Sequence, residues 1–129
     1  MSDKLTVEII TPEQSILKSN ADEVTIPSYE GQIGILKDHV PIITFLRPGI
    51  ISVQDLKKKE YYVEEGTVEF SNNNLIILTS SAHDLNNLNK RSIEDLLNQL
   101  KNKLSNDTFS DKERYLLSYK ISTLEEINQ

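Results

Sequence analysis

The side chains best suited to acid–base chemistry lie in one short stretch, from Glu30 to His39. Glu30 and Asp38 could act as paired carboxylates, and His39 could act as a general base. The chain has only one other histidine, His83, no cysteine, and no nucleophile pattern beside these residues. We therefore predict no catalytic residue and no metal site. The two acids are interpreted as solvated turn residues, and His39 as a turn or interface residue.

Two further patterns bear on phosphate binding, and neither is complete. Lys57, Lys58 and Lys59 could grip phosphates, but in a hairpin corner of an acidic region they are better interpreted as a solvated loop tip. Gly31 and Gly34 lack the Gly-Lys-Ser/Thr ending of a phosphate-binding loop, and no strand-to-helix turn follows them. The sequence therefore predicts no bound cofactor.

Charge and composition narrow the class of protein. Of 129 residues, 37% are hydrophobic and 26% charged, which is a globular balance, and the formal net charge is −6. Residues 1–85 carry 7 basic and 13 acidic side chains, whereas residues 86–129 carry 7 of each. The excess of negative charge therefore lies entirely in residues 1–85. An acidic chain is not attracted unspecifically to nucleic acid or to anionic lipid. No apolar run approaches the roughly 20 residues of a membrane helix, and no signal or transit peptide is apparent, so we expect a cytoplasm-like compartment.

The elements that position these residues are short strands separated by tight corners. The stretch Pro27–Gly49 holds three of the four glycines and three of the four prolines, residues that specify turns. Apolar residues at period two, or in short runs, predict strands at 5–10, 16–17, 24–26, 33–36, 42–46, 51–53, 61–63, 68–70 and 75–78. The intervening corners are expected at 18–20, 30–32, 37–39, 57–59 and 71–74.

Beyond Leu85 the apolar spacing becomes helical, and no glycine or proline follows Gly66. Asn89 could cap a first helix, and Ser110 with Glu113 forms a capping box that opens a second, with Phe109 as its hydrophobic staple. The apolar faces are expected at Ile93, Leu96, Leu97, Leu100 and Leu104 in the first helix, and at Leu117, Ile121 and Leu124 in the second.

The fold class follows from this order of elements. We predict a mainly β protein with added α structure: an N-terminal β-sandwich, or flattened barrel of roughly nine or ten strands, over residues 1–84, and an antiparallel two-helix hairpin over residues 85–129. Two short helices do not bury enough apolar surface to be stable alone. The hairpin must therefore dock on the sandwich or on a partner.

The central stretch resembles the signature of the epsilon subunits of F-type ATP synthases. In that family a Glu-Gly-x-x-Gly-Ile-Leu turn and strand precedes His-x-Pro and then a Thr-x-Leu-x-Pro-Gly corner. The matching segments here are Glu30–Leu36, His39–Pro41 and Thr44–Gly49. The resemblance covers the whole chain in architecture.

The resemblance implies a rotor component of the F1 sector without chemistry of its own. In the family the sandwich binds the gamma subunit and rests on the ring of c subunits, so that proton flow turns the central stalk during ATP synthesis. The residues carried over to these interfaces are Glu30, Gly31, Gln32, His39 and Pro41, with Gln32 where several relatives have an acid. The implied location is the cytoplasmic side of the bacterial inner membrane, as a peripheral protein that contacts the membrane only through the complex.

An alternative is an ATP-sensing regulatory module, because some bacterial members of the family bind ATP at the hairpin through an Ile/Leu-Asp-x-x-Arg-Ala motif. The aligned residues are Leu88, Asn89, Lys90, Arg91, Ser92 and Ile93. Asn89 replaces the aspartate and Ser92 occupies the arginine position. One residue turns a helical side chain by about 100°, so Arg91 is poorly placed to substitute.

In the family the hairpin can also extend toward the alpha and beta subunits and slow ATP hydrolysis, through a basic second helix. Here that helix mixes three cations, Lys112, Arg114 and Lys120, with acids at positions 111, 113, 125 and 126. Opposite-sign steering toward an acidic surface is therefore weak. We expect modest inhibition.

Overall fold

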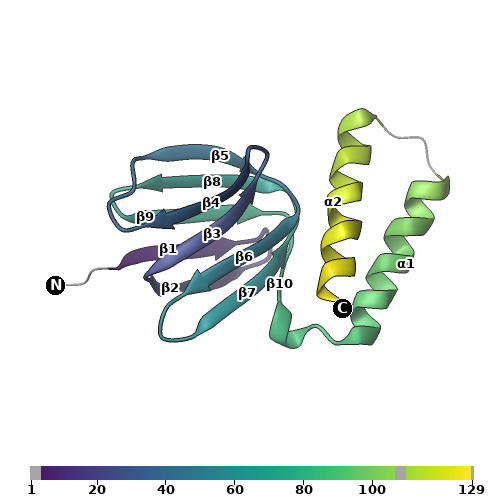
Figure 1. Ribbon diagram of the computed structural model, residues 1–129, viewed down its shortest axis with the longest axis horizontal. Helices are drawn as coiled ribbons and strands as arrows, with labels where there is room; N and C mark the ends of the chain where they lie inside the picture. The colour runs from purple at the N-terminus through teal and green to yellow at the C-terminus, as the bar shows by residue number, and fades with distance from the viewer. Residues whose placement is uncertain (1–3, 107–109, 129) are drawn as a thin grey trace.

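The computed structural model describes residues 4–106 and 110–128 and contains ten strands, a short 3-10 turn and two helices. The strands form a barrel-like body, and the helices lie together at one end of it (Figure 1). The strands are β1 (Leu5–Ile10), β2 (Ser15–Ala21), β3 (Glu23–Ser28), β4 (Gly31–Leu36), β5 (Ile42–Leu46), β6 (Gly49–Gln54), β7 (Lys58–Val63), β8 (Gly66–Ser71), β9 (Asn74–Thr79) and β10 (Ala82–Asp84). The 3-10 turn η1 (Leu85–Asn87) leads into α1 (Lys90–Asn106) and α2 (Asp111–Ile127).

The strands form one curled sheet in the order β10-β7-β6-β3-β5-β8-β9-β1-β2, with β4 added on β3. β1 and β9 pair in parallel, and the other recorded pairs are antiparallel. β2 and β10, the two ends of the path, line a common groove, so the sheet is nearly closed. The predicted flattened barrel of nine or ten strands is therefore confirmed. The strand that sequence periodicity missed is β10, whose three residues are too few to show a period.

Alternation along the strands builds the barrel core. In β1 the buried side chains are Leu5, Val7 and Ile9, with the residues between them less buried, as expected for a half-buried strand. The same alternation in the other strands gives a core of Leu17, Ala21, Val24, Ile26, Ile35, Leu46, Ile51, Val53, Tyr61, Val63, Val68, Phe70, Leu75 and Ile77. No helix residue belongs to this core, so the barrel interior is complete without the hairpin.

Three predicted corners differ from the structure. The corner at Lys18–Asn20 is wrong, because β2 continues through it to Ala21. The polar side chains of Lys18 and Asn20 lie on the exposed face of this strand, and Leu17 and Ala21 keep the buried face. The corner predicted at 30–32 lies earlier, since Ser28 pairs with Gly31 and only Tyr29 and Glu30 form the turn. The corner predicted at 57–59 also lies earlier, at residues 55–57, because β7 begins at Lys58. Lys58 and Lys59 are therefore exposed strand residues rather than a loop tip.

The two helices begin where the sequence predicts. Asn89 Oδ1 accepts a hydrogen bond from the Ser92 amide at 2.8 Å, and Ser110 with Glu113 makes a reciprocal capping box. Phe109, the predicted staple, lies outside the described residues. The two helices run antiparallel beside each other (Figure 1), and Lys101 of α1 forms an ion pair with Glu125 of α2 at 3.6 Å.

The hairpin docks on the outer side of β7 and forms a second core there. Tyr61 and Tyr62 are adjacent in β7, so they point to opposite faces: Tyr61 into the barrel and Tyr62 toward the helices. Tyr62 packs with buried Ile93, Leu97 and Leu124, surrounded by the half-buried residues Leu85, Leu88, Leu96, Leu100, Ile121 and Ile127. Burial, followed by the nearby Glu64 carboxylate, raises the pKa of Tyr62 above its ordinary range. The expectation that the hairpin needs a surface on which to dock is met by the barrel itself.

Candidate interaction surfaces

The β3–β4 turn positions the first group of predicted interface residues. Buried Ser28 fixes this turn, because its hydroxyl donates to the Gly31 carbonyl at 2.7 Å and accepts from the Glu30 amide at 3.2 Å. Gly31 has φ = 113°, a conformation that side chains resist, so a glycine is required there. Glu30 and Gln32 are both exposed, and Gln32 lines a groove beside α2.

The β4–β5 corner positions the second group, and a reciprocal pair of hydrogen bonds fixes it. The Asp38 amide donates to Asn73 Oδ1 at 2.7 Å, and Asn73 Nδ2 donates to Asp38 Oδ1 at 3.0 Å. Asp38 and Asn73 both have positive φ, so two tight corners are locked to each other. The half-buried ring of His39 lies edge-on to Phe70 at 6.0 Å between centroids, and Pro41 is exposed.

The structure does not bring these two groups together. The β3–β4 turn lies at the helix end of the barrel, whereas the β4–β5 corner lies at the opposite end (Figure 1). β4 has six residues and separates them by about 17–20 Å. One partner surface can contact both groups only if it runs along β4.

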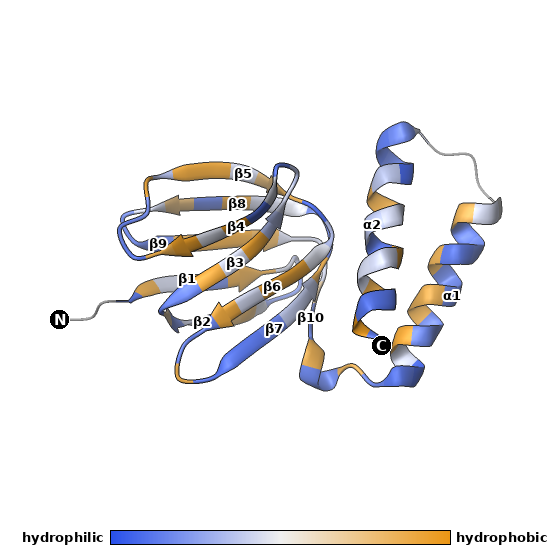
Figure 2. Ribbon diagram, in the orientation of Figure 1, coloured by the Kyte–Doolittle hydropathy of each residue, from blue (hydrophilic) through white to orange (hydrophobic). Residues whose placement is uncertain are grey.

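A third surface was not predicted: an exposed apolar face on the outside of β5, β8, β9 and β1. In β5, Ile43 is 81% and Phe45 62% exposed, and Figure 2 shows β5 hydrophobic along most of its length. Two apolar residues of β9, Ile76 and Leu78, complete the face. The sheet register connects these strands: Ile43 pairs with Glu69 of β8, which in turn pairs with Ile76. We call the set Ile43, Phe45, Ile76 and Leu78 the sheet face.

A shallow hollow of about 350 Å³ adjoins the sheet face at its β1 side. Its lining is nearly all apolar at the surface and includes Ile10, Pro12 and Leu78. An apolar depression next to a flat apolar face can receive one anchoring side chain of a partner. Glu69 and Thr67 are the exposed polar side chains that β8 contributes between Ile43, Phe45 and the β9 residues.

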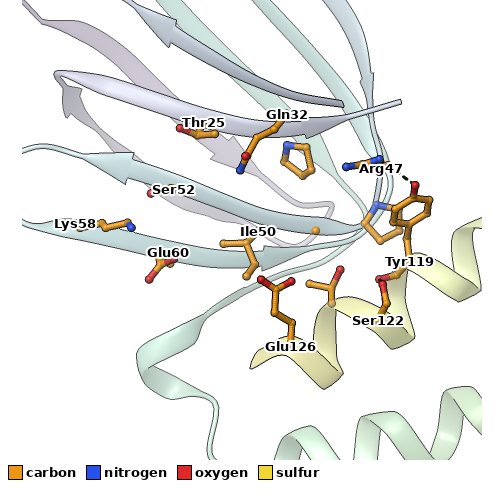
Figure 3. Close-up of a pocket in the computed structure, with 14 residues that line it drawn as sticks. Thr25, Gln32, Arg47, Ile50, Ser52, Lys58, Glu60, Tyr119, Ser122 and Glu126 are labelled. Atoms are coloured by element: carbon orange, nitrogen blue, oxygen red, sulfur yellow. Dashed lines mark hydrogen bonds between the residues drawn. The ribbon is translucent and has the colours of Figure 1, made fainter. Parts of the chain in front are cut away.

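The helix α2 is held to the barrel end by two adjacent residues. The Arg47 guanidinium lies over the Tyr119 ring at 4.5 Å and donates to its hydroxyl at 3.1 Å, as the dashed line in Figure 3 marks. The next residue, Lys120, lies 3.7 Å from Glu64 and 3.2 Å from Glu65 in the β7–β8 corner. These polar contacts add to the apolar packing around Tyr62.

The same helix and the sheet enclose a groove of about 540 Å³, shown in Figure 3. Its charged lining residues are Arg47 and Lys58, balanced by Glu60 and Glu126. Arg47 is engaged with Tyr119, and Lys58 and Glu60 lie at the opposite end of the groove (Figure 3). With no excess of positive charge, and with the negative end of the α2 dipole at Glu126, this groove does not favour a polyphosphate.

The residues of the degenerate ATP motif have structural partners instead. Leu88 packs against the second core and Asn89 caps α1. Arg91 is exposed in the first turn of α1, and Ser92 donates its amide to the Asn89 cap. A groove of about 430 Å³ that adjoins Leu88 has Tyr61, His83 and Asp84 as its titratable lining residues and no lysine or arginine. The groove next to this segment therefore lacks the cations that a triphosphate requires.

The described residues show neither a metal-binding cluster nor a membrane-spanning helix. Within residues 4–106 and 110–128, no His, Asp and Glu side chains gather in a group of three or more that could hold a metal ion. In the same ranges, neither helix is long and apolar enough to cross a membrane.

A curled, mostly antiparallel sheet with an exposed apolar face, followed by a docked helical hairpin, is suited to binding another protein through that face. The family model for the "ATP synthase, Delta/Epsilon chain, beta-sandwich domain" matches residues 4–84. The chain is 44% identical to the ATP synthase epsilon chain of Pelagibacter ubique, over 99% of this chain and all of the relative. It is 30% identical to that of Hyphomonas neptunium, over 97% of this chain and 94% of the relative. The chain belongs to the ATP synthase epsilon chain family, and is a non-catalytic subunit of the complex that links ATP synthesis to proton transport.

Solved structures agree with the fold. A chain in the mitochondrial ATP synthase of Euglena gracilis, solved as OSCP, F1 and c-ring, superposes with a TM-score of 0.81 at 21% identity, covering all of this chain and 84% of that one. A chain in the central stalk and c-ring of the Tetrahymena thermophila enzyme superposes with a TM-score of 0.72 at 14% identity, covering 96% of each chain. The family and fold that the signature predicted are confirmed.

Proposed function

We propose that this chain is a component of the central stalk, and that it docks on the gamma subunit through the sheet face and couples proton flow through the c ring to ATP synthesis. The observation that carries the proposal is the exposure of Ile43 and Phe45 beside Ile76 and Leu78. Large apolar side chains gathered on one face of a soluble protein mark a protein–protein interface. The Tetrahymena chain of similar fold comes from a central stalk and c-ring assembly.

The chemistry of the sheet face defines its partner. Glu69 lies in the row between Ile43 and Ile76, so a docked partner covers its carboxylate. A covered charge needs an opposite charge beside it, because an unpaired buried charge is costly. We infer that gamma presents aliphatic side chains to Ile43 and Phe45 and a lysine or arginine to Glu69.

We further propose that the c ring contacts Glu30, Gly31 and Gln32 in the β3–β4 turn, and His39 with Pro41 in the far corner. Both groups can reach one surface if β4 lies along it. The strand pairing supports this arrangement, because β4 pairs with β3 alone among the described strands. The complex, rather than a segment of this chain, would then hold the protein at the cytoplasmic side of the bacterial inner membrane.

The chain divides, on this proposal, into a docking sandwich over residues 1–84 and a regulatory hairpin over residues 85–129. The separate cores support the division, since the barrel core contains no hairpin residue. A fragment of residues 1–84 should therefore unfold cooperatively in thermal circular dichroism. Loss of any cooperative transition would contradict the division.

The hairpin would reach the alpha and beta subunits only after leaving the barrel, and we propose that its inhibition of ATP hydrolysis is modest. To leave the barrel, α2 must break the ion pairs of Lys120 with Glu64 and Glu65, which opposes its extension. Deletion of residues 86–129 should change hydrolysis by the assembled enzyme only slightly. Severalfold activation would contradict this.

The proposed function is tested by adding the purified chain to inverted membrane vesicles that lack it. The wild-type chain should restore ATP synthesis driven by a proton gradient. Phe45→Glu should fail to restore it, because a carboxylate on the sheet face cannot be desolvated against an apolar partner. Leu56→Glu is the control, since Leu56 is 94% exposed in the β6–β7 turn and lies outside the sheet face. Equal restoration by both variants would contradict docking through the sheet face.

ATP sensing is the second candidate, and only the resemblance of the Leu88–Ile93 segment favours it. The absence of lysine and arginine from the lining of the adjoining groove argues against it. Calorimetry with ATP distinguishes the two candidates.

A further inference from the structure

A chain of aromatic rings connects the sheet face to the hairpin. Phe45 of the sheet face lies 6.3 Å from Tyr29, and Tyr29 lies 5.6 Å from Tyr115 of α2, both measured between ring centroids. Tyr115 in turn lies 4.8 Å from Tyr119, which Arg47 covers. Phe45 belongs to β5, Tyr29 to the β3–β4 turn, and Tyr115 and Tyr119 to α2. One row of rings therefore crosses from β5 through this turn onto α2.

The outer part of this row is open to solvent. Tyr29 is 39% and Tyr115 38% exposed, values between those of a core aromatic residue and the 62% of Phe45. Tyr115 lies one helical turn before Tyr119, whose hydroxyl is engaged with Arg47. Tyr115 can therefore present its ring at the surface while the helix stays docked. Tyrosine is among the residues most enriched in protein interfaces, because it offers a large rigid apolar area with a polar tip.

We propose that the docking surface for the stalk partner extends from the sheet face over Tyr29 onto Tyr115, so that a partner seated on it holds α2 against the barrel. This inference rests on the proposed function and adds a regulatory consequence to it. A partner that contacts both the barrel and α2 binds better while the hairpin is docked. By reciprocity, its binding must shift the hairpin toward the docked position.

The occupant is the gamma subunit rather than a second copy of this chain. The Glu69 carboxylate lies within the apolar face, and a twofold copy would bring a second face with the same acidic residue against it. A partner with an aliphatic ridge and one cation fits both the apolar residues and the carboxylate. The continuity of the aromatic row with the sheet face gives the same partner access to Tyr115.

The test is hydrogen–deuterium exchange of the α2 amides, residues 111–127, in the full-length chain with and without purified gamma subunit. Saturating gamma should slow exchange in α2 by about tenfold, a typical coupling between two linked sites. Tyr29→Ala removes the ring between Phe45 and Tyr115. With enough gamma added to saturate the variant, it should reduce this slowing to less than about threefold.

Tyr29→Phe is the matched control, because it keeps the ring contacts and should behave as the wild-type chain does. Gamma binding without any slowing in α2, or with faster exchange there, overturns the inference and leaves the proposed function standing. Equal slowing in Tyr29→Ala and in the wild-type chain overturns the role of the aromatic row. Absence of gamma binding, or dimerisation of the chain through Phe45 in sedimentation, overturns both proposals.

Discussion

Arg47 and Tyr119 are 72 residues apart in the chain, and the Arg47 guanidinium lies 4.5 Å above the Tyr119 ring while it donates a hydrogen bond to the Tyr119 hydroxyl at 3.1 Å. Arg47 comes from the corner between β5 and β6, next to the sheet face, and Tyr119 lies at the middle of α2. This pair thus joins the corner of the signature segment to the helical hairpin. Its strength helps to set how readily the hairpin leaves the barrel.

Arg47→Ala should weaken docking of the hairpin. A partly exposed cation–π contact and one hydrogen bond together contribute about 1–2 kcal/mol, which corresponds to roughly a tenfold larger open fraction. Limited proteolysis within α2 should therefore be about tenfold faster in the variant. Arg114→Ala is the control, since Arg114 is exposed in the first turn of the same helix. Equal proteolysis rates in the two variants would show that the Arg47–Tyr119 contact does not hold the helix.

The two glycines Gly34 and Gly66 should respond very differently to alanine. A Cβ at Gly66 would lie 2.0 Å from the Leu78 carbonyl oxygen and within 3 Å of Thr79 backbone, so the β8–β9 pairing would have to move. A Cβ at Gly34 would meet only the end of the flexible Glu23 side chain, at 3.1 Å. We expect Gly66→Ala to lower the free energy of unfolding by about 3 kcal/mol and Gly34→Ala by less than about 1 kcal/mol. Urea denaturation measures both free energies of unfolding. A similar loss in the two variants would contradict the close backbone contact at Gly66.

Alkaline pH should release the hairpin through Tyr62. The folded-state pKa of Tyr62 is raised above the ordinary value of 10.0, mainly by burial and then by Glu64. The stability contributed by the neutral tyrosine is therefore complete below pH 10 and is lost as pH rises above it. Between pH 9 and pH 11, hydrogen–deuterium exchange of α2, corrected for the intrinsic rate, should accelerate more in the wild-type chain than in Tyr62→Phe. An identical pH profile in the two proteins would show that Tyr62 ionisation does not control docking.

ATP should not bind the isolated chain. The segment Leu88–Ile93 has Asn89 and Ser92 where the nucleotide-binding relatives have aspartate and arginine. No lysine or arginine lines the adjoining groove. Isothermal titration with 1 mM ATP, about the top of the usual range for a metabolite site, should give no binding heat. The double variant N89D and S92R, which completes both motif positions, is the informative comparison. Micromolar binding by the wild-type chain would instead support the ATP-sensing alternative.

Much of the fold could be predicted because many of its corners contain glycine, proline or asparagine, the residues that favour turn conformations. Asn72 and Asn73, for example, both have positive φ in the β8–β9 turn, within the corner predicted at 71–74. The Lys18–Asn20 prediction failed for an equally physical reason. Polar residues on the solvent face of a strand look like a corner when only Leu17 and Ala21 mark the buried face.

The interaction surfaces were harder to predict than the strands. The run Ile42–Leu46 is apolar almost throughout, and such a run does not reveal which side of the strand stays exposed. Only the sheet register shows that Ile43 and Phe45 share one outer face with Ile76 and Leu78. Tyr29 and Tyr115 are 86 residues apart, and no local pattern predicts their contact. The family signature pointed instead to the corners at Glu30 and His39, whose partner contacts stay predictions.

The most direct test of the stalk role is size-exclusion chromatography of this chain with the gamma subunit from the same source. We predict co-elution as a one-to-one complex, with Phe45→Glu eluting separately as a folded monomer. Separate elution of the folded wild-type chain would contradict docking on gamma through the sheet face.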